Sequence, residues 1–80
     1  MELKDTIELM QSADYKDRFK AEYQQLKIRT DKLEKFVDNY DNLDFTPDCT
    51  KHILKKQYDI MTSYLNILEE RASIEKIELV

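Results

Sequence analysis

Glycine and tryptophan are absent from this sequence of 80 residues, and proline occurs only once. Glycine-rich phosphate loops and dinucleotide-binding fingerprints need glycine where the backbone approaches phosphate, so P-loop and Rossmann cofactor enzymes are excluded. A fold rich in β-strands would also want turn glycines. Because glycine and proline are the residues that break helices, the composition predicts long helices and an all-α fold.

Cysteine and histidine are nearly absent as well, with Cys49 and His52 the single examples. One cysteine cannot form an internal disulfide, which fits a reducing compartment. The two residues share one helix face, but no third group stands with them to build a thiolate catalyst or a metal site. Asp38, Asp41 and Asp44 lack the glycine and the terminal glutamate of a calcium loop. We therefore predict no enzymatic activity, no metal and no cofactor.

The net charge of −4 argues against stable nucleic-acid binding, because phosphate neutralisation needs clustered lysine and arginine. No signal-peptide pattern begins the sequence, and it lacks the roughly 18 consecutive apolar residues of a membrane span. These features predict a cytoplasmic protein without a membrane partner. A chain of this size buries only about 60% of its unfolded surface. We expect a single domain, residues 1–80, that gains stability from another chain.

Capping signals divide the chain into three helices. Ser12 and Asp14 are typical helix starts, and Thr46 followed by Pro47 is a second strong start. Between them lies an Asn- and Asp-rich turn, whose Leu43 and Phe45 are expected to plug the closed end of the helix pair. The predicted elements are a short helix at about 3–11 and long helices at about 13–41 and 47–75.

The two long helices carry matching apolar seams with steps of four and three residues, the coiled-coil period. The first seam consists of Phe19, Tyr23, Leu26, Thr30, Leu33, Val37 and Tyr40, and the second of Leu54, Tyr58, Met61, Leu65, Leu68 and Ala72. A short loop between such helices makes them antiparallel neighbours. The sequence therefore predicts a short amino-terminal helix followed by an antiparallel two-helix hairpin.

A second apolar row runs beside the seam of the last helix, formed by Ile53, Ile60, Tyr64, Ile67 and Ile74. One hairpin cannot cover both rows, so the remaining row leaves a contiguous apolar patch on a monomer. Such patches mark interfaces. We therefore predict a homo-oligomer that associates through helical faces.

Aromatic and cationic residues gather in the first half of the first long helix, where the candidate ligand-binding residues are Tyr15, Arg18, Lys27, Arg29 and Thr30. Aromatic rings stack on bases, and lysine and arginine bind phosphate. Thr30 occupies a seam position where an aliphatic residue would pack better, so it either fixes the register or faces a pocket. The alternative is that the aromatic residues belong to the core and that the cations lie over them.

Several segments resemble a known family: DYKDRFKAEY at 14–23, LKIR at 26–29, LDFTP at 43–47 and LEERASIE at 68–75. Together they resemble a family of small bacteriophage and prophage proteins first labelled from a crAss-like phage. That family is in turn similar to the helical-hairpin sponge proteins with which phages defeat CBASS and Thoeris immunity. The resemblance covers nearly the whole chain.

This resemblance implies an oligomer that sequesters a cyclic-nucleotide or cyclic ADP-ribose-type immune signal without cleaving it, in the cytoplasm of the infected host. In the sponges an aromatic residue stacks on a base while lysine or arginine binds phosphate. Tyr15 and Lys27 are the nearest counterparts here, with Arg18 or Arg29 as further phosphate contacts. The alternatives are a protein-binding inhibitor of a host or defence protein, including an anti-CRISPR, and a structural helper of the phage particle.

Overall fold

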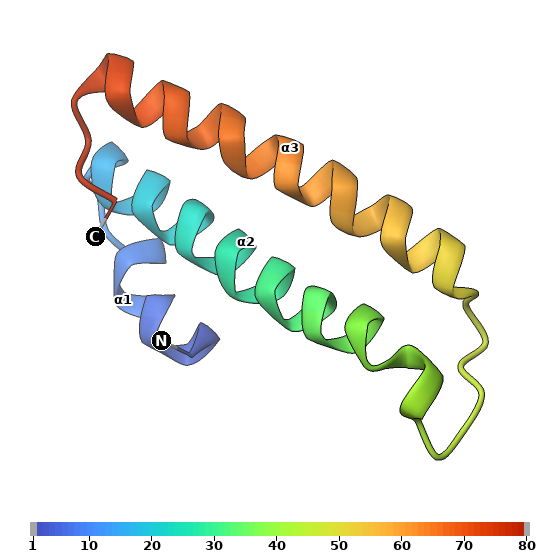
Figure 1. The fold of residues 1–80 in the computed structure, drawn as a ribbon. Helices are drawn as coiled ribbons and strands as arrows, with labels where there is room; N and C mark the ends of the chain where they lie inside the picture. The colour runs from blue at the N-terminus through green and yellow to red at the C-terminus, as the bar shows by residue number, and fades with distance from the viewer. Residues whose placement is uncertain (1, 80) are drawn as a thin grey trace.

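The computed structural model describes residues 2–79, and the prediction of an all-α chain is confirmed for them (Figure 1). No strand occurs within this range. The molecule measures 43 × 25 × 17 Å along its principal axes. Its elements are the 3-10 helix η1 (Leu3–Thr6), the α-helices α1 (Ile7–Met10) and α2 (Tyr15–Asp38), the 3-10 helix η2 (Tyr40–Asn42) and the α-helix α3 (Lys51–Glu75).

The long helices α2 and α3 lie side by side and run in opposite directions, while α1 packs against α2 away from α3 (Figure 1). Four polar contacts join the long helices, from Tyr15 with Arg71 at one end to Glu34 with Tyr58 at the other, as in an antiparallel pair. These contacts are Tyr15–Arg71, Glu22–Tyr64, Tyr23–Glu69 and Glu34–Tyr58. On the other side of α2, the side chain of Gln25 donates to the buried hydroxyl of Thr6 at 3.0 Å.

The start of α2 uses the predicted capping residues. The carboxylate of Asp14 accepts a hydrogen bond from the backbone N–H of Lys16 at 2.9 Å. The hydroxyl of Ser12 accepts from the N–H of Asp14 at 3.0 Å and donates to Asp17 at 2.8 Å. These bonds satisfy donors that have no partner inside the helix. The helix ends at Asp38, and η2 follows where the prediction continued to about residue 41.

The start of α3 differs from the prediction, because the cap is Thr50 and not Thr46. The hydroxyl of Thr50 accepts from the N–H of Ile53 at 3.3 Å. In a helix begun at Pro47, this N–H would bond to the carbonyl of Cys49. The carbonyl of Cys49 instead accepts from the hydroxyl of Tyr40 at 3.0 Å. Cys49 thus lies outside α3, which begins at Lys51.

A cap substitution tests this correction. We expect Thr50→Ala to lower the free energy of unfolding by about 1 kcal/mol, since the N–H of Ile53 loses its acceptor. Thr46→Ala is the matched control and should change stability by less than about 0.5 kcal/mol. Urea unfolding followed by circular dichroism measures both. An equal or larger loss at Thr46 would contradict the observed helix start.

The predicted seams form the contact between the long helices, and every residue named for them is buried or half-buried. The tightest packing lies at the end of the helix pair that no loop closes, called the open end below. There Phe19, Leu68, Ala72 and Ile77 form one cluster. Ile77 reaches this cluster because Lys76 adopts a left-handed conformation with φ 58° and turns the chain back toward α2. At the opposite end Leu43 is half-buried, but Phe45 is 62% exposed, so the prediction that Phe45 helps to close this end is wrong.

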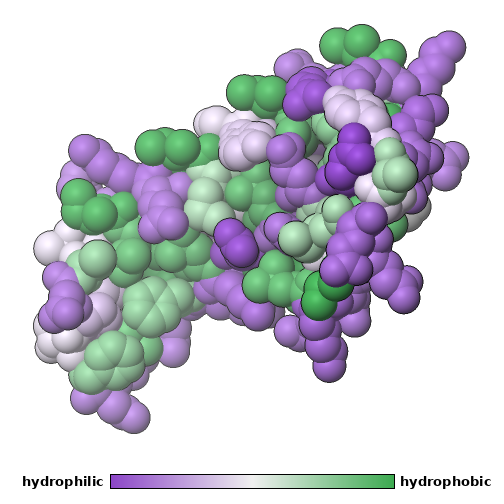
Figure 2. Space-filling model, turned by 180° about the vertical axis from the view of Figure 1, so that it is seen from behind, coloured by the Kyte–Doolittle hydropathy of each residue, from purple (hydrophilic) through white to green (hydrophobic). Residues whose placement is uncertain are grey.

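The second apolar row of α3 stays on the surface. Ile53, Ile60, Tyr64, Ile67 and Ile74 are all exposed large hydrophobic residues. Seen from behind, apolar side chains stand at intervals along the outer edge of α3 (Figure 2). Neither α1 nor α2 covers this face.

Candidate functional site

A groove of about 500 Å³ lies on α2, bordered by both ends of the described chain. Side chains from four successive turns of α2 form its floor, while Glu2 and Leu79 stand at its sides. Its lining consists of Glu2, Tyr23, Gln24, Lys27, Ile28, Asp31, Lys32, Lys35 and Leu79. Binding pockets for small molecules span about 300–1,000 Å³, so the groove has the size of a ligand site.

Three lysines and two carboxylates line the groove. Lys27 lies 3.4 Å from Asp31, and Lys32 lies 3.8 Å from Glu2. Both pairs are more than half exposed, and surface pairs of this kind contribute about 0–1 kcal/mol. Lys35 has no ion-pair partner among residues 2–79. An anion with several oxygens can therefore replace the weak existing pairs and also engage Lys35.

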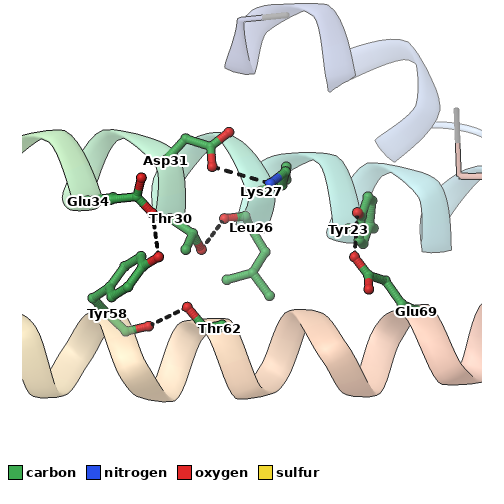
Figure 3. A network of polar contacts seen from close by, with 9 residues as sticks. All are labelled: Tyr23, Leu26, Lys27, Thr30, Asp31, Glu34, Tyr58, Thr62 and Glu69. Carbon is green, nitrogen blue, oxygen red and sulfur yellow. Dashed lines mark hydrogen bonds and ion pairs between the residues drawn. The ribbon is translucent and has the colours of Figure 1, made fainter.

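Tyr23 and Gln24 provide the uncharged recognition groups. The hydroxyl of Tyr23 donates to Glu69 of α3 at 3.0 Å, which fixes the ring at the edge of the groove (Figure 3). The side-chain oxygen of Gln24 is buried and has no hydrogen-bond partner within the described chain. An unpaired buried acceptor costs about 1–3 kcal/mol. A ligand N–H that reached this oxygen would remove that cost.

Burial and neighbouring carboxylates raise the pKa of three tyrosine hydroxyls between the helices. The pKa of Tyr23 is raised first by burial and then by its hydrogen bond to Glu69. The pKa of Tyr64 is raised by burial and by its bond to Glu22. For Tyr58 the hydrogen bond to Glu34 is the largest cause of a raised pKa (Figure 3). The phenols therefore act as donors, which hold α2 and α3 in register.

A second, smaller hollow of about 210 Å³ lies on the other side of the helix pair and is lined by Tyr15, Arg18, Phe19, Glu22 and Arg71. Arg71 is its central cation. Its guanidinium donates to the hydroxyl of Tyr15 at 2.6 Å and to Glu75 at 3.4 Å. It also lies 4.8 Å from the centre of the Phe19 ring, a cation–π distance.

The five residues predicted as a ligand site do not come together in one place. Tyr15 and Arg18 line the smaller hollow, and Lys27 lines the groove. Arg29 is exposed and lines neither. Thr30 is buried against α3, and its hydroxyl donates to the carbonyl of Leu26 at 2.6 Å (Figure 3). That bond satisfies the Thr30 hydroxyl within its own helix.

Sequence reasoning missed Lys32, Lys35 and Gln24 in the groove and Arg71 in the smaller hollow. The spacing of Lys27, Asp31 and Lys35 by four residues does indicate one helical face and is a usable signal. Gln24 has no comparable signal, because nothing in the sequence shows that its oxygen is buried. Arg71 lies 56 residues from Tyr15 along the chain, so only the pairing of the helices reveals their contact.

None of the helices between residues 2 and 79 combines the length and apolar content that crossing a bilayer requires. No match was found among curated proteins or among solved structures. The model of one protein family, described as Sequestin, matches residues 13–74. That span includes all of α2, α3 except its last residue, the smaller hollow and most of the groove. The chain therefore belongs to the Sequestin family.

Proposed function

We propose that this chain captures a small nucleotide signal in the groove on α2 and holds it without cleaving it. The family name Sequestin indicates a sequestering role, which is binding rather than catalysis. The observation that carries the proposal is the groove itself. It combines three lysines with a fixed tyrosine ring and an unpaired buried amide oxygen.

The phosphates of the signal would lie against the lysines. Lys27 and Lys32 hold only long, exposed contacts to carboxylates, at 3.4 and 3.8 Å, and Lys35 holds none within the described chain. Charge-assisted hydrogen bonds to phosphate are shorter, about 2.7–2.9 Å, and roughly twice as strong as neutral ones. Phosphate therefore competes well for these cations.

The base would lie toward Tyr23 and Gln24. Stacking on an aromatic ring contributes about 1–3 kcal/mol per base and tolerates different bases. The oxygen of Gln24 accepts a hydrogen bond and therefore favours a base with an amino group. One end of the groove would then recognise charge and the other a purine or pyrimidine ring.

The class of signal follows from the resemblance to phage sponge proteins. We propose a cyclic nucleotide or a cyclic ADP-ribose-type molecule that a bacterial defence system makes during phage infection. The chain would act as one domain in the host cytoplasm, associate with copies of itself and starve the defence effector by mass action. Of the residues predicted from the sequence, Lys27 would contact this ligand directly.

Titration of the purified protein with cyclic dinucleotides, cyclic trinucleotides and cyclic ADP-ribose isomers tests the proposal. We expect calorimetric heat with at least one ligand and a thermal shift that grows with its concentration. At 100 times the dissociation constant the stabilisation is about 2.7 kcal/mol. Mass spectrometry of the ligand released by denaturation should return it intact.

Two results would contradict the proposal. The first is the absence of heat and of thermal shift with every ligand of the panel, which would favour inhibition of a protein partner. The second is a released ligand of altered mass, which would indicate catalysis.

A further inference from the structure

The outer face of α3 carries an isoleucine at every seventh residue. Ile53, Ile60, Ile67 and Ile74 are 52%, 70%, 54% and 79% exposed. The row spans 21 residues, which is about 32 Å of helix. Figure 2 shows the corresponding apolar side chains along the outer edge of the helix. A regularly spaced row of exposed isoleucines over this length is typical of a helix–helix interface.

The residues between the isoleucines complete a second coiled-coil seam. Gln57, Tyr64 and Arg71 each follow an isoleucine by four residues and precede the next by three. This is the same period as the buried seam against α2. A helix with such a seam fits another helix with the same repeat, because the seam then faces its partner along the whole length.

We infer that a second copy of this chain covers the row, with the two α3 helices packed antiparallel. This inference rests on the self-association proposed above and specifies its geometry. A parallel pair would set the Arg71 side chains of the two chains against each other. An antiparallel pair places the two Arg71 side chains at opposite ends of the interface.

Charges beside the seam favour the same direction. Lys56, Ser63 and Glu70 occupy equivalent flanking positions, seven residues apart, and all three are exposed. In the antiparallel pair Lys56 meets the partner's Glu70, and symmetry repeats this contact at the other end. Ser63 lies opposite its own copy near the two-fold axis. A parallel pair leaves Lys56 and Glu70 far apart, since they lie two heptads from each other.

This arrangement also completes the smaller hollow. Aligning the seams so that Lys56 pairs with the partner's Glu70 places Ile60 opposite the partner's Tyr64. It also places the partner's Ile53 beside Arg71, which lines the hollow with Tyr15 and Arg18. In the dimer the hollow is therefore bounded by two chains, and in a single chain it stays open on that side.

Sedimentation equilibrium tests the interface. The wild-type protein should have twice the 9.7 kDa mass of one chain. Ile60→Glu should reduce the mass to one chain, because a carboxylate at the centre of the seam lacks a partner. Phe45→Glu is the control, since it changes another exposed apolar residue, which lies in the loop, and it should remain dimeric. A monomeric wild type, or an Ile60→Glu protein that stays dimeric with unchanged helical content, overturns the inference.

Charge exchange tests the direction of the helices. Lys56→Glu and Glu70→Lys should each weaken dimerisation several-fold, and the double variant should restore it. Failure of the double variant to recover affinity overturns the antiparallel pairing.

Nucleotide titration separates this inference from the proposed function. A dimer that binds no nucleotide supports the interface and rejects only the function. Nucleotide binding by a monomeric wild type rejects only the interface.

Discussion

Replacing Leu68 with alanine should lower the free energy of unfolding by about 2–5 kcal/mol. Leu68 is only 1% exposed and lies at the centre of the cluster with Phe19, Ala72 and Ile77. The substitution removes buried methyl groups and leaves a cavity that rigid helices do not fill. A chain of this length is stable by roughly 4–12 kcal/mol in total. The loss is therefore a large share of the total free energy of unfolding.

Thermal and urea unfolding followed by circular dichroism measure this effect. Phe45→Ala is the control, because Phe45 is large and apolar but 62% exposed, and its loss should stay within about 0.5 kcal/mol. Similar losses for the two variants would show that the cluster at the open end does not form the core.

Reversing two charges in the groove should reduce nucleotide affinity by roughly 100-fold or more. The double variant Lys32→Glu with Lys35→Glu removes two phosphate contacts and adds repulsion. Hydrogen bonds to charged groups contribute about 1.5–3 kcal/mol each, and 1.4 kcal/mol corresponds to tenfold in affinity. Both lysines are exposed, so the fold should persist. Isothermal titration calorimetry with the best ligand of the panel measures the change.

A matched variant controls for net charge. Lys16→Glu with Lys55→Glu makes the same change at exposed positions that do not line the groove. Its affinity should fall only a few-fold, and that loss should shrink at higher salt. If both double variants lose affinity equally, the groove is not the binding site. If only variants of Tyr15 and Arg18 lose nucleotide affinity, the smaller hollow is the binding site.

The helices and their contact faces could be predicted because both follow from local periodicity. The four-three steps from Phe19 to Tyr40 and from Leu54 to Ala72 identified the sides that pack. The start of α3 could not be predicted, because two threonines four residues apart both make good caps. The structure selects Thr50, and the carbonyl of Cys49 before it accepts from the hydroxyl of Tyr40, a contact that the sequence does not indicate.

The candidate sites were predicted less well, because they depend on which side of α2 each neighbour covers. Lys27 was named from the sequence, whereas Lys35 lies two turns further on the same face and needed the structure. From their spacing in the sequence alone, Tyr15 and Arg29 were both candidate ligand-binding residues. Only Tyr15 meets Arg71, since that arginine comes from the far end of α3.

The core lies at the open end of the helix pair, and this position determines which end of the two helices separates first. Glu34 and Tyr58, near the loop, are 24 residues apart along the chain, whereas Tyr15 and Arg71 are separated by 56. Closing the longer segment costs only about 0.7 kcal/mol more in chain entropy, since that cost grows with the logarithm of length. Burying Leu68 alone contributes about 1.5–3 kcal/mol.

The end of the helix pair whose contacting residues are furthest apart in sequence is therefore the more stable end. On α3 no residue before Leu65 is buried, so the turns next to the loop have little apolar packing. Fluctuations should separate the helices first at the loop and last at the termini. Amide hydrogen exchange would record this as earlier exchange at residues 51–58 than at residues 65–72.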